Sequence, residues 1–350
     1  MEVKLRVRRQ NEQTGHQPQW QEYQVEVDEH GTVLDALIHI REYVDETLSV
    51  RCSCRSQICG SCGMQINHQM ALGCKTKVRD VVSDDGVITV EPMGNMGVVK
   101  DLVTDLEPFW GKVRQIKPYL QPDHQPEREY IVPFEDMESV KGAMACIMCG
   151  LCVAACNSME VNPQFIGPAA LAKNWRFLAD PRDAAAKERL EYVSQPNGIW
   201  DCTHCFYCVE VCPKGVAPME LIVDTRRMAM EAGITDNNGS RHSQAFVDTV
   251  SAYGRLDETK VAIRSVSGIG ELLQFAGVGW RSFWRGKVPL RMKTIPGVHH
   301  VRRIFQQLET GPEAQRQKKK RRAMPHPSAT ALVGELTAPV QIPPRKDEPK

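Results

Sequence analysis

The sequence predicts an α+β protein in which a small mixed sheet is followed by a mostly helical region. Two observations support this fold class. Within roughly the first hundred residues, several stretches alternate apolar and polar residues with a period of two, which is the pattern of half-buried strands. From about Asp101 onward, that alternation is replaced by apolar residues at helical spacing.

The predicted sheet consists of strands arranged around one helix, over residues 1–105. The strands are expected in EVKLRVRRQ, QEYQVEVDE and VVSDDGVITVEP. The helix is expected in TVLDALIHIREYV, with Thr32 as its N-cap. A cysteine-rich loop lies between this helix and the last strand, so the order of elements predicts a mixed sheet crossed by one helix.

Residues 106–235 are predicted to be helical. One helix is expected in GPAALAKNWRFLADPRD, with Pro168 in its first turn. Another is expected in APMELIVDTRRMAMEAG, where Gly233 ends the helix.

Asn237 and Gly239 mark a boundary, after which a helical C-terminal extension is predicted for residues 236–312. Residues 313–350 are rich in proline and charge, so we expect a disordered tail.

The composition favours metal binding through cysteine. The chain has 44 Lys and Arg against 43 Asp and Glu, which gives no indication of nucleic-acid binding. Its thirteen cysteines occur without the apolar stretch of a secretory signal, so we expect thiols in a reducing compartment rather than disulfides. The sequence contains no run of eighteen apolar residues, so it predicts no membrane-spanning helix.

The first cysteine motif has the spacing of a plant-type ferredoxin, which holds a [2Fe–2S] cluster on four thiolates. Four residues, then two, then eleven separate its members, which are Cys54, Cys59, Cys62 and Cys74. Gly60 and Gly63 allow the backbone to approach the cluster closely. A zinc site is the alternative, but zinc motifs usually begin with pairs two to four residues apart.

Two further motifs, CIMCGLCVAAC and CTHCFYCVEVC, share one spacing and indicate a pair of clusters. In two-cluster ferredoxins of this type, the fourth cysteine of each run binds the other cluster. One set is then Cys146, Cys149, Cys152 and Cys212, and the other is Cys202, Cys205, Cys208 and Cys156. Crossed ligation predicts that this region unfolds without its clusters. Zinc knuckles or buried thiols are the less favoured alternatives.

Cys52 is the thirteenth cysteine and completes no repeat. A small buried side chain or an idle thiol explains it better than a ligand role.

With these motifs, the chain resembles the iron–sulfur subunit of succinate dehydrogenase and fumarate reductase. The resemblance extends to TVLDAL, RCSCRSQICGSCGMQI, VVKDLVTDLEPFW, FIGPAALAKNWRFLADPRD and CPKGVAP, and covers roughly residues 1 to 230. It implies a plant-type, β-grasp-like ferredoxin domain followed by an all-α helical ferredoxin domain.

The resemblance also implies a function. In the family, a flavoprotein subunit interconverts succinate and fumarate at covalently bound FAD, and electrons pass through three clusters to a membrane anchor that carries quinone. The chain itself has no GxGxxG motif, so substrate chemistry is expected on the partner. A peripheral position on the cytoplasmic face of the inner membrane is implied.

The sequence departs from the family pattern around the third cluster. That cluster is usually [3Fe–4S], with an aliphatic residue where Cys205 stands, so Cys205 predicts a second [4Fe–4S] cluster. The stretch CNSMEVNP lacks the tryptophans that help to form the usual quinone site. Thr203 stands where the family often has histidine.

These departures resemble a minority subclass whose partner is a heterodisulfide-reductase-like subunit instead of a haem-bearing anchor. Residues 284–305 support this weakly, since they resemble segments of heterodisulfide-reductase-type proteins. An electron carrier for a thiol or heterodisulfide reductase complex is therefore the alternative function. A zinc-dependent interaction protein is a third hypothesis.

Two features outside the cysteine motifs allow two interpretations each. The apolar and aromatic stretch 272–284 could meet a membrane or anchor subunit, or could pack within the C-terminal region. The basic run 318–322 could contact anionic lipid or nucleic acid, but a solvated run is the default.

Overall fold

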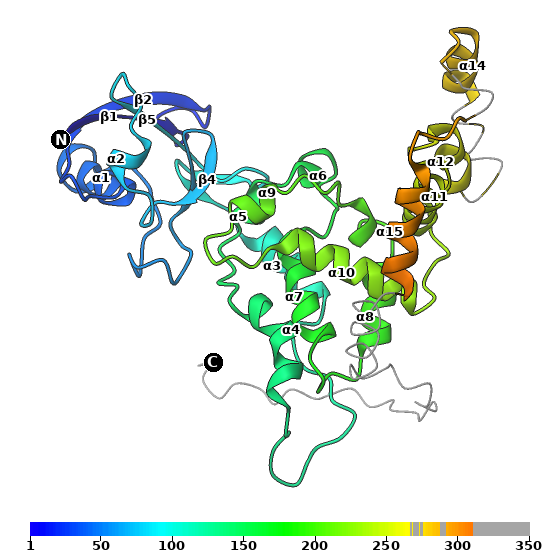
Figure 1. Cartoon of the computed structure of the whole chain (residues 1–350). Coiled ribbons are helices and arrows are strands. Elements are labelled where there is room, and N and C mark those ends of the chain that lie inside the picture. Colours follow the sequence, from blue (N-terminus) through cyan, green and yellow to red (C-terminus); the bar gives the residue numbers. More distant parts are fainter. Residues whose placement is uncertain (267, 269–272, 274–275, 288–291, 311–350) are drawn as a thin grey trace, which may run out of the picture.

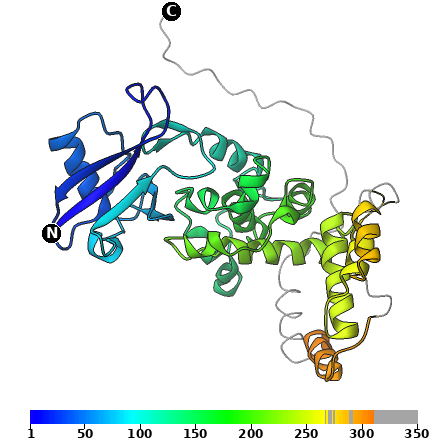
Figure 2. The same cartoon turned by 90° about the horizontal axis from the view of Figure 1, so that it is seen from above.

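The structure is a computed structural model, and it describes residues 1–266, 268, 273, 276–287 and 292–310. A mixed sheet, a helical middle part and a group of C-terminal helices follow one another in space in the order of the sequence (Figures 1 and 2). The predicted α+β class is therefore confirmed. The boundaries expected at residues 105, 235 and 312 stay predictions.

The main sheet has five strands in the order β2-β1-β5-β3-β4. The strands are β1 (Glu2–Arg9), β2 (Gln19–Glu26), β3 (Gly63–Ile66), β4 (Gln69–Leu72) and β5 (Val87–Glu91). β1 is antiparallel to β2 and parallel to β5, and β3 is antiparallel to both β4 and β5. The predicted strands correspond to β1, β2 and β5. The β3–β4 hairpin, whose strands have four residues each, was not predicted.

Helix α1 (Val33–His39) crosses the sheet and continues into the π-helix η1 (Ile40–Val44). The predicted N-cap is confirmed, because the Thr32 hydroxyl accepts from Asp35 N at 3.2 Å. The Asp35 carboxylate accepts from Thr32 N at 3.0 Å, which completes a capping box. The apolar side of α1 and the inward residues of β1 and β5 form one core, which includes Leu5, Leu37 and Ile88.

A short hairpin, β6 (Val98–Lys100) with β7 (Val103–Thr104), and helix α2 (Val78–Val81) complete this part. The helical middle part contains α3 (Glu107–Gln115), α4 (Phe134–Met144), α5 (Leu151–Ala154), α6 (Asn157–Val161), α7 (Pro168–Leu178), α8 (Ala186–Val193), the 3₁₀-helix η2 (Ile199–Asp201), α9 (Tyr207–Glu210) and α10 (Pro218–Glu231).

Helix α7 lies at the centre of the middle part and packs against α4 and α10. Pro168 stands in its first turn, as predicted, and its buried face includes Leu171 and Phe177. α10 ends just before Gly233, whose φ of +79° suits a residue after a helix. Both cysteine repeats lie on short helices and loops around these longer helices.

The C-terminal region is helical over its described residues. Its helices are α11 (Asn238–Tyr253), α12 (Glu258–Ser265), α14 (Ala276–Trp284) and α15 (Val298–Thr310). The predicted boundary residue Asn237 is the N-cap of α11 and accepts from Ser240 N at 2.8 Å. The predicted disordered tail and the basic run 318–322 lie outside the described residues. Among the helices that the structure describes, none is long and apolar enough to cross a membrane.

Candidate iron–sulfur sites

The loop between η1 and β3 surrounds the sulfur of Cys54 with backbone donors. Three N–H groups donate to Cys54 Sγ at 3.3 to 3.4 Å, those of Ser56, Ile58 and Cys59. Close to the sheet, Cys74 N donates to Cys62 Sγ at 3.4 Å. N–H groups that point at a cysteine sulfur can also donate to the sulfur of a bound cluster ligand.

Left-handed backbone produces this arrangement. Arg55, Gln57 and Gly60 have φ values of +52°, +59° and +74°, so the chain curls tightly around the Cys54 sulfur. Cys59 is exposed at the tip of the loop, whereas Cys62 and Cys74 are buried at the sheet. The structure thus brings the four cysteines of the first motif to one loop and the adjoining hairpin.

Two thiols of this loop differ in acidity. The Ser61 hydroxyl and the Cys54 backbone are hydrogen-bonded to Cys59 and lower its pKa to about 6. Burial raises the pKa of Cys62 to about 12, and the nearby Cys74 thiol adds to this effect.

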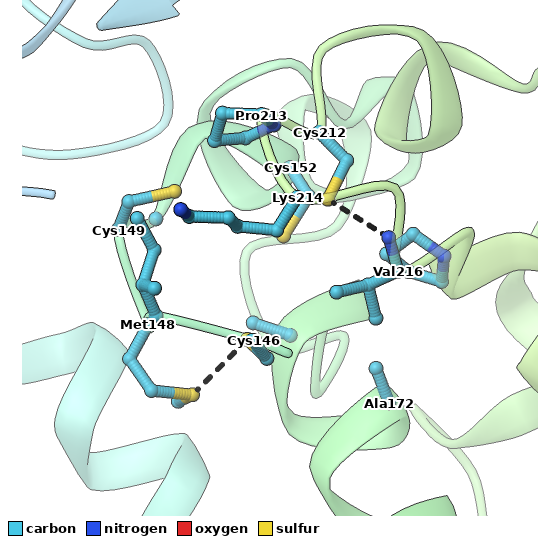
Figure 3. Close-up of a pocket in the computed structure, with 13 residues that line it drawn as sticks. Cys146, Met148, Cys149, Cys152, Ala172, Cys212, Pro213, Lys214 and Val216 are labelled. Atoms are coloured by element: carbon cyan, nitrogen blue, oxygen red, sulfur yellow. Dashed lines mark hydrogen bonds between the residues drawn. The ribbon is translucent and has the colours of Figure 1, made fainter. Parts of the chain in front are cut away.

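The first repeat and the end of the second repeat meet in one pocket, shown in Figure 3. The pocket is lined by the sulfur-bearing residues Cys146, Cys149, Cys152 and Cys212. Val216 N donates to Cys212 Sγ at 3.3 Å. Burial raises the pKa of Cys149 to about 11, and the Cys146 and Cys212 thiols contribute to the rise. This grouping is the crossed set that the spacing predicts.

The other crossed set is also brought together. Burial raises the pKa of Cys208 to about 12, and its neighbours Cys202, Cys156 and Cys205 raise it further. Burial is likewise the main cause of the raised pKa of Cys156, to which Cys205 and Cys202 contribute. These effects place Cys156, Cys202, Cys205 and Cys208 in one neighbourhood.

The two repeats have the same backbone conformation around their second cysteines. Met148 and His204, which precede Cys149 and Cys205, have φ values of +55° and +57°. The following residues, Gly150 and Phe206, have φ values of +82° and +67° and cap the short helices α5 and α9. A bulky residue such as Phe206 rarely adopts this conformation. Cys205 therefore occupies the same local position as Cys149.

Two contacts connect the three groups of thiols. A Cβ atom built on Gly60 would lie 2.6 Å from Cys149 Cβ, so the first loop touches the first repeat without space for a side chain. Burial raises the pKa of Cys152 well above its ordinary value, and both Cys149 of its own group and Cys208 of the other contribute. Cys152 of the first repeat is therefore near a cysteine of the other crossed set.

Polar side chains surround the third group. Thr203 Oγ1 lies 3.4 Å from Ser158 Oγ. Arg226 of α10 donates from Nη2 to the Cys202 carbonyl at 2.8 Å, and its Nη1 lies 2.7 Å from His204 Nε2. Burial, followed by the Arg226 charge, lowers the pKa of His204. Arg226 was not identified from the sequence, because nothing in the α10 pattern distinguishes it from a surface arginine.

Cys52 is half-buried and packs against the sheet core. Arg41 Nη1 is 3.9 Å from its sulfur. Whether Cys52 is a packing side chain or an idle thiol stays a prediction.

Across the part of the chain that the structure describes, no three His, Cys, Asp or Glu side chains are arranged to hold a single metal ion. Four thiolates share two irons in a [2Fe–2S] cluster and bind four different irons in a [4Fe–4S] cluster, so the ligands of a cluster are not grouped around one ion.

Two protein families match the chain in the regions of these motifs. A family described as a 2Fe-2S iron-sulfur cluster binding domain matches residues 4–111. A family described as a 4Fe-4S dicluster domain matches residues 142–216. Domains for both cluster types are therefore present.

Named relatives agree with these matches. The fumarate reductase iron-sulfur subunit of Haemophilus influenzae is 37% identical over 234 residues, which cover 63% of this chain and 90% of the relative. The corresponding subunit of Escherichia coli O6:H1 is 40% identical over 222 residues, with the same coverage of 63% and 90%.

A solved structure is also similar. It is a chain of the Mycobacterium smegmatis Sdh1 complex in the apo form, with a TM-score of 0.59 and 28% sequence identity. The match covers 67% of this chain and 98% of that chain. The chain therefore belongs to the family of iron–sulfur subunits of succinate dehydrogenase and fumarate reductase, and its role is that of an electron-transfer subunit in such an oxidoreductase complex.

Proposed function

We propose that twelve cysteines of this chain hold three clusters that carry electrons between a FAD-containing flavoprotein subunit and an acceptor subunit. The [2Fe–2S] ligands are Cys54, Cys59, Cys62 and Cys74; the first [4Fe–4S] ligands are Cys146, Cys149, Cys152 and Cys212; the second [4Fe–4S] ligands are Cys156, Cys202, Cys205 and Cys208. Each cluster, when bound, accepts and releases single electrons. The observation that carries this proposal is the gathering of the thiols into three neighbouring groups.

The residues of each group fit an iron–sulfur cluster. Thiolates are the preferred protein ligands of iron–sulfur clusters, and each group supplies four of them. Backbone N–H groups that already point at Cys54 and Cys212 would also help to stabilise the negative charge of a bound cluster. The contact of Gly60 with Cys149 and the position of Cys152 beside Cys208 support an electron path through the groups in this order.

Cys205 is proposed as the fourth ligand of the third group. Its backbone conformation repeats that of Cys149, and its thiol influences the acidity of both Cys156 and Cys208. Exposure does not argue against this role, since Cys59 of the first motif is exposed as well. Without Cys205 as a ligand, the third cluster would be [3Fe–4S].

Iron analysis of the anaerobically purified chain tests the number of irons. Clusters of two, four and four irons give about ten per chain, and a [3Fe–4S] third cluster gives about nine. A Cys205→Ala variant is expected to lose about one iron and to keep the others. Cys52→Ala is the matched control and is expected to lose none. Equal iron content in the wild type and Cys205→Ala would refute the fourth ligand.

The exposed side of the third group supports electron exit at this face. Phe206 and Tyr207 are exposed beside Cys205, and Val161 of α6 is 88% exposed. Residues 157–161 contain no aromatic side chain that could wall a quinone pocket. The acceptor at this face is then a membrane-anchor subunit, which passes electrons to quinone, or a heterodisulfide-reductase-like subunit. A peripheral position on the cytoplasmic face of the inner membrane is part of this proposal.

The lack of an aromatic side chain in residues 157–161 also favours the alternative function, an electron carrier for a thiol or heterodisulfide reductase complex. Purification of the native complex through a tag on this chain separates the two. The main proposal predicts a stoichiometric FAD subunit and clusters that succinate reduces and fumarate reoxidises, as followed by EPR. Clusters that respond to dithiols but not to succinate, in a complex without FAD, would replace the main proposal with the alternative.

A further inference from the structure

Helix α14 exposes aromatic side chains that no other part of the described chain covers. None of its residues, 276–284, is buried. Trp280, Phe283 and Trp284 are 65%, 49% and 70% exposed. The expectation that this stretch packs within the C-terminal region is therefore wrong for the described residues. Large exposed aromatic residues on one short helix indicate an interaction surface.

The three rings gather on one side of the helix. Trp280 and Trp284 are one turn apart, and their ring centroids are 5.7 Å apart in an edge-to-face arrangement. The Phe283 ring lies 6.3 Å from Trp284. α14 stands at the end of the C-terminal helices that is remote from the cysteine groups (Figure 1). A flat surface could reach the aromatic cluster without meeting the helical middle part.

The charge of this segment is entirely positive. Arg281, Arg285 and Lys287 accompany the rings, and residues 276–287 contain no Asp or Glu. Arg281, Arg285 and Lys287 are all exposed. An occupant of this surface must therefore offer an apolar layer and negative charge close to each other.

We propose that α14 lies in the surface of a bilayer that contains anionic lipids. The rings of Trp280, Phe283 and Trp284 enter the boundary between headgroups and acyl chains, where tryptophan is favoured. Arg281, Arg285 and Lys287 stay among the phosphate groups. A helix of nine residues is about 14 Å long, which is too short to span the bilayer, so it lies in the plane of the surface.

A bilayer fits this helix better than a groove on a protein. An anionic membrane presents headgroup charge above an apolar layer over its whole area, which matches rings and cations on a helix with no acidic residue. This contact belongs to α14 alone and lies beyond residue 216, where the second family match ends. The proposal is independent of the cluster assignment, and it adds a direct lipid contact to any contact made through an anchor subunit.

Vesicle co-sedimentation of the full-length chain, purified with its clusters and without other subunits, tests the proposal. We expect binding to vesicles of phosphatidylcholine with phosphatidylglycerol, and at least tenfold weaker binding to phosphatidylcholine alone. The triple variant W280A/F283A/W284A should weaken binding at least tenfold. The triple variant R281Q/R285Q/K287Q should weaken vesicle binding by about fivefold for each of its three removed charges, because a surface cation contributes about 1 kcal/mol.

Two control variants separate α14 from other sources of binding. F246A/V247A removes exposed apolar side chains from α11 and should bind as the wild type. Replacement of the basic run 318–322 by glutamine tests whether the tail binds lipid, and it should leave most of the affinity in place. Cluster absorbance, which should be unchanged in every variant, shows that the chain is intact.

Any of three results in the vesicle experiments would overturn the proposal. They are wild-type affinity in W280A/F283A/W284A, affinity that does not depend on the anionic lipid, and loss of binding only when the run 318–322 is replaced. If the wild type binds no vesicles but W280A/F283A/W284A fails to join the native complex, the occupant is a protein subunit and the lipid proposal is also overturned.

Discussion

The cysteine loop at residues 54–62 adjoins a sheet whose apolar core also includes Leu151 and Ala154 of the first repeat, whereas the repeats at 146–156 and 202–212 bring cysteines of both segments into shared groups. Leu5 and Ile88 under the loop are fully buried, and their packing needs no cluster. In contrast, the short helices α5 and α9 direct their cysteines toward groups that combine both repeats. We expect from this difference that bound iron contributes less to the folding of the first region than to the folding of the repeats, where each proposed ligand set joins two distant segments.

The largest expected effect comes from removing a shared ligand. Cys212→Ser takes one proposed ligand from the group that joins both repeats, so the helical middle part should lose its cooperative unfolding transition. Cys74→Ser is the matched variant in the first motif and should leave that transition in place. Hydrogen exchange with mass spectrometry measures both. Protected amides in α5 and α9 of Cys212→Ser would remove the contrast between the two regions.

A second prediction concerns the independence of the sheet. Arg9 is 2% exposed and pairs with Asp101 at 3.0 Å and with Asp45 at 2.7 Å. Arg9→Met leaves these carboxylates without their cation, so we expect a loss of about 3–5 kcal/mol in the free energy of unfolding. Lys4→Met, which breaks the exposed pair with Glu22, should cost less than about 1 kcal/mol.

Denaturant unfolding followed by the sheet signal measures both variants. The helical middle part should keep its own transition in Arg9→Met. A joint loss of both parts would mean that the sheet and the repeats fold as one unit.

A third prediction addresses the contact between the regions. In Gly60→Ala, the new Cβ would lie 2.8 Å from Cys149 Cα and the residue would have φ of +74°. Gly86→Ala has the same backbone strain, with φ of +75°, but meets no atom within 4 Å. Gly60→Ala should therefore lose about 1–3 kcal/mol more stability than Gly86→Ala, because of overpacking.

Stopped-flow reduction of the clusters adds a functional measurement to this pair. Electron exchange between the first and second groups should slow in Gly60→Ala and stay unchanged in Gly86→Ala. Equal behaviour of the two variants would show that the Gly60 contact does not matter for transfer.

The smallest effect is expected from pH. Before iron binds, the pKa of Cys149 is about 11 and that of Cys208 about 12, so both thiols carry protons at pH 7 that binding must release. Cys59, with a pKa of about 6, is mostly thiolate at pH 7. Raising pH from about 7 to about 8.5 should therefore favour cluster assembly in the repeats more steeply than in the first loop.

Reconstitution of the cluster-free chain, followed by EPR of each cluster type, measures the two slopes. Cys62 also has a raised pKa of about 12, so cluster assembly in the first loop should increase with pH as well. Identical slopes would contradict the difference between the regions.

The spacing of the cysteines predicted the three groups, because covalent spacing limits which thiols can share a site, and the helical spacing of apolar residues predicted the helices between and after the repeats. Thr32 and Pro168 predicted helix starts, because an N-cap side chain and a first-turn proline act within the local sequence. The β3–β4 hairpin escaped prediction because its turn places Asn67 and His68 at φ of +45° and +65°, with no glycine as a signal. Arg9 was also missed, because a basic residue at the end of a strand usually faces water, whereas here distant carboxylates surround it.

The central claim is that Cys205 is a fourth cluster ligand, and low-temperature EPR of the oxidised, anaerobically purified chain tests it most directly. We predict no [3Fe–4S] signal in the wild type or in Cys52→Ala, and a new isotropic [3Fe–4S] signal in Cys205→Ile. A stoichiometric [3Fe–4S] signal in undamaged wild-type protein, unchanged by Cys205→Ile, would contradict the account.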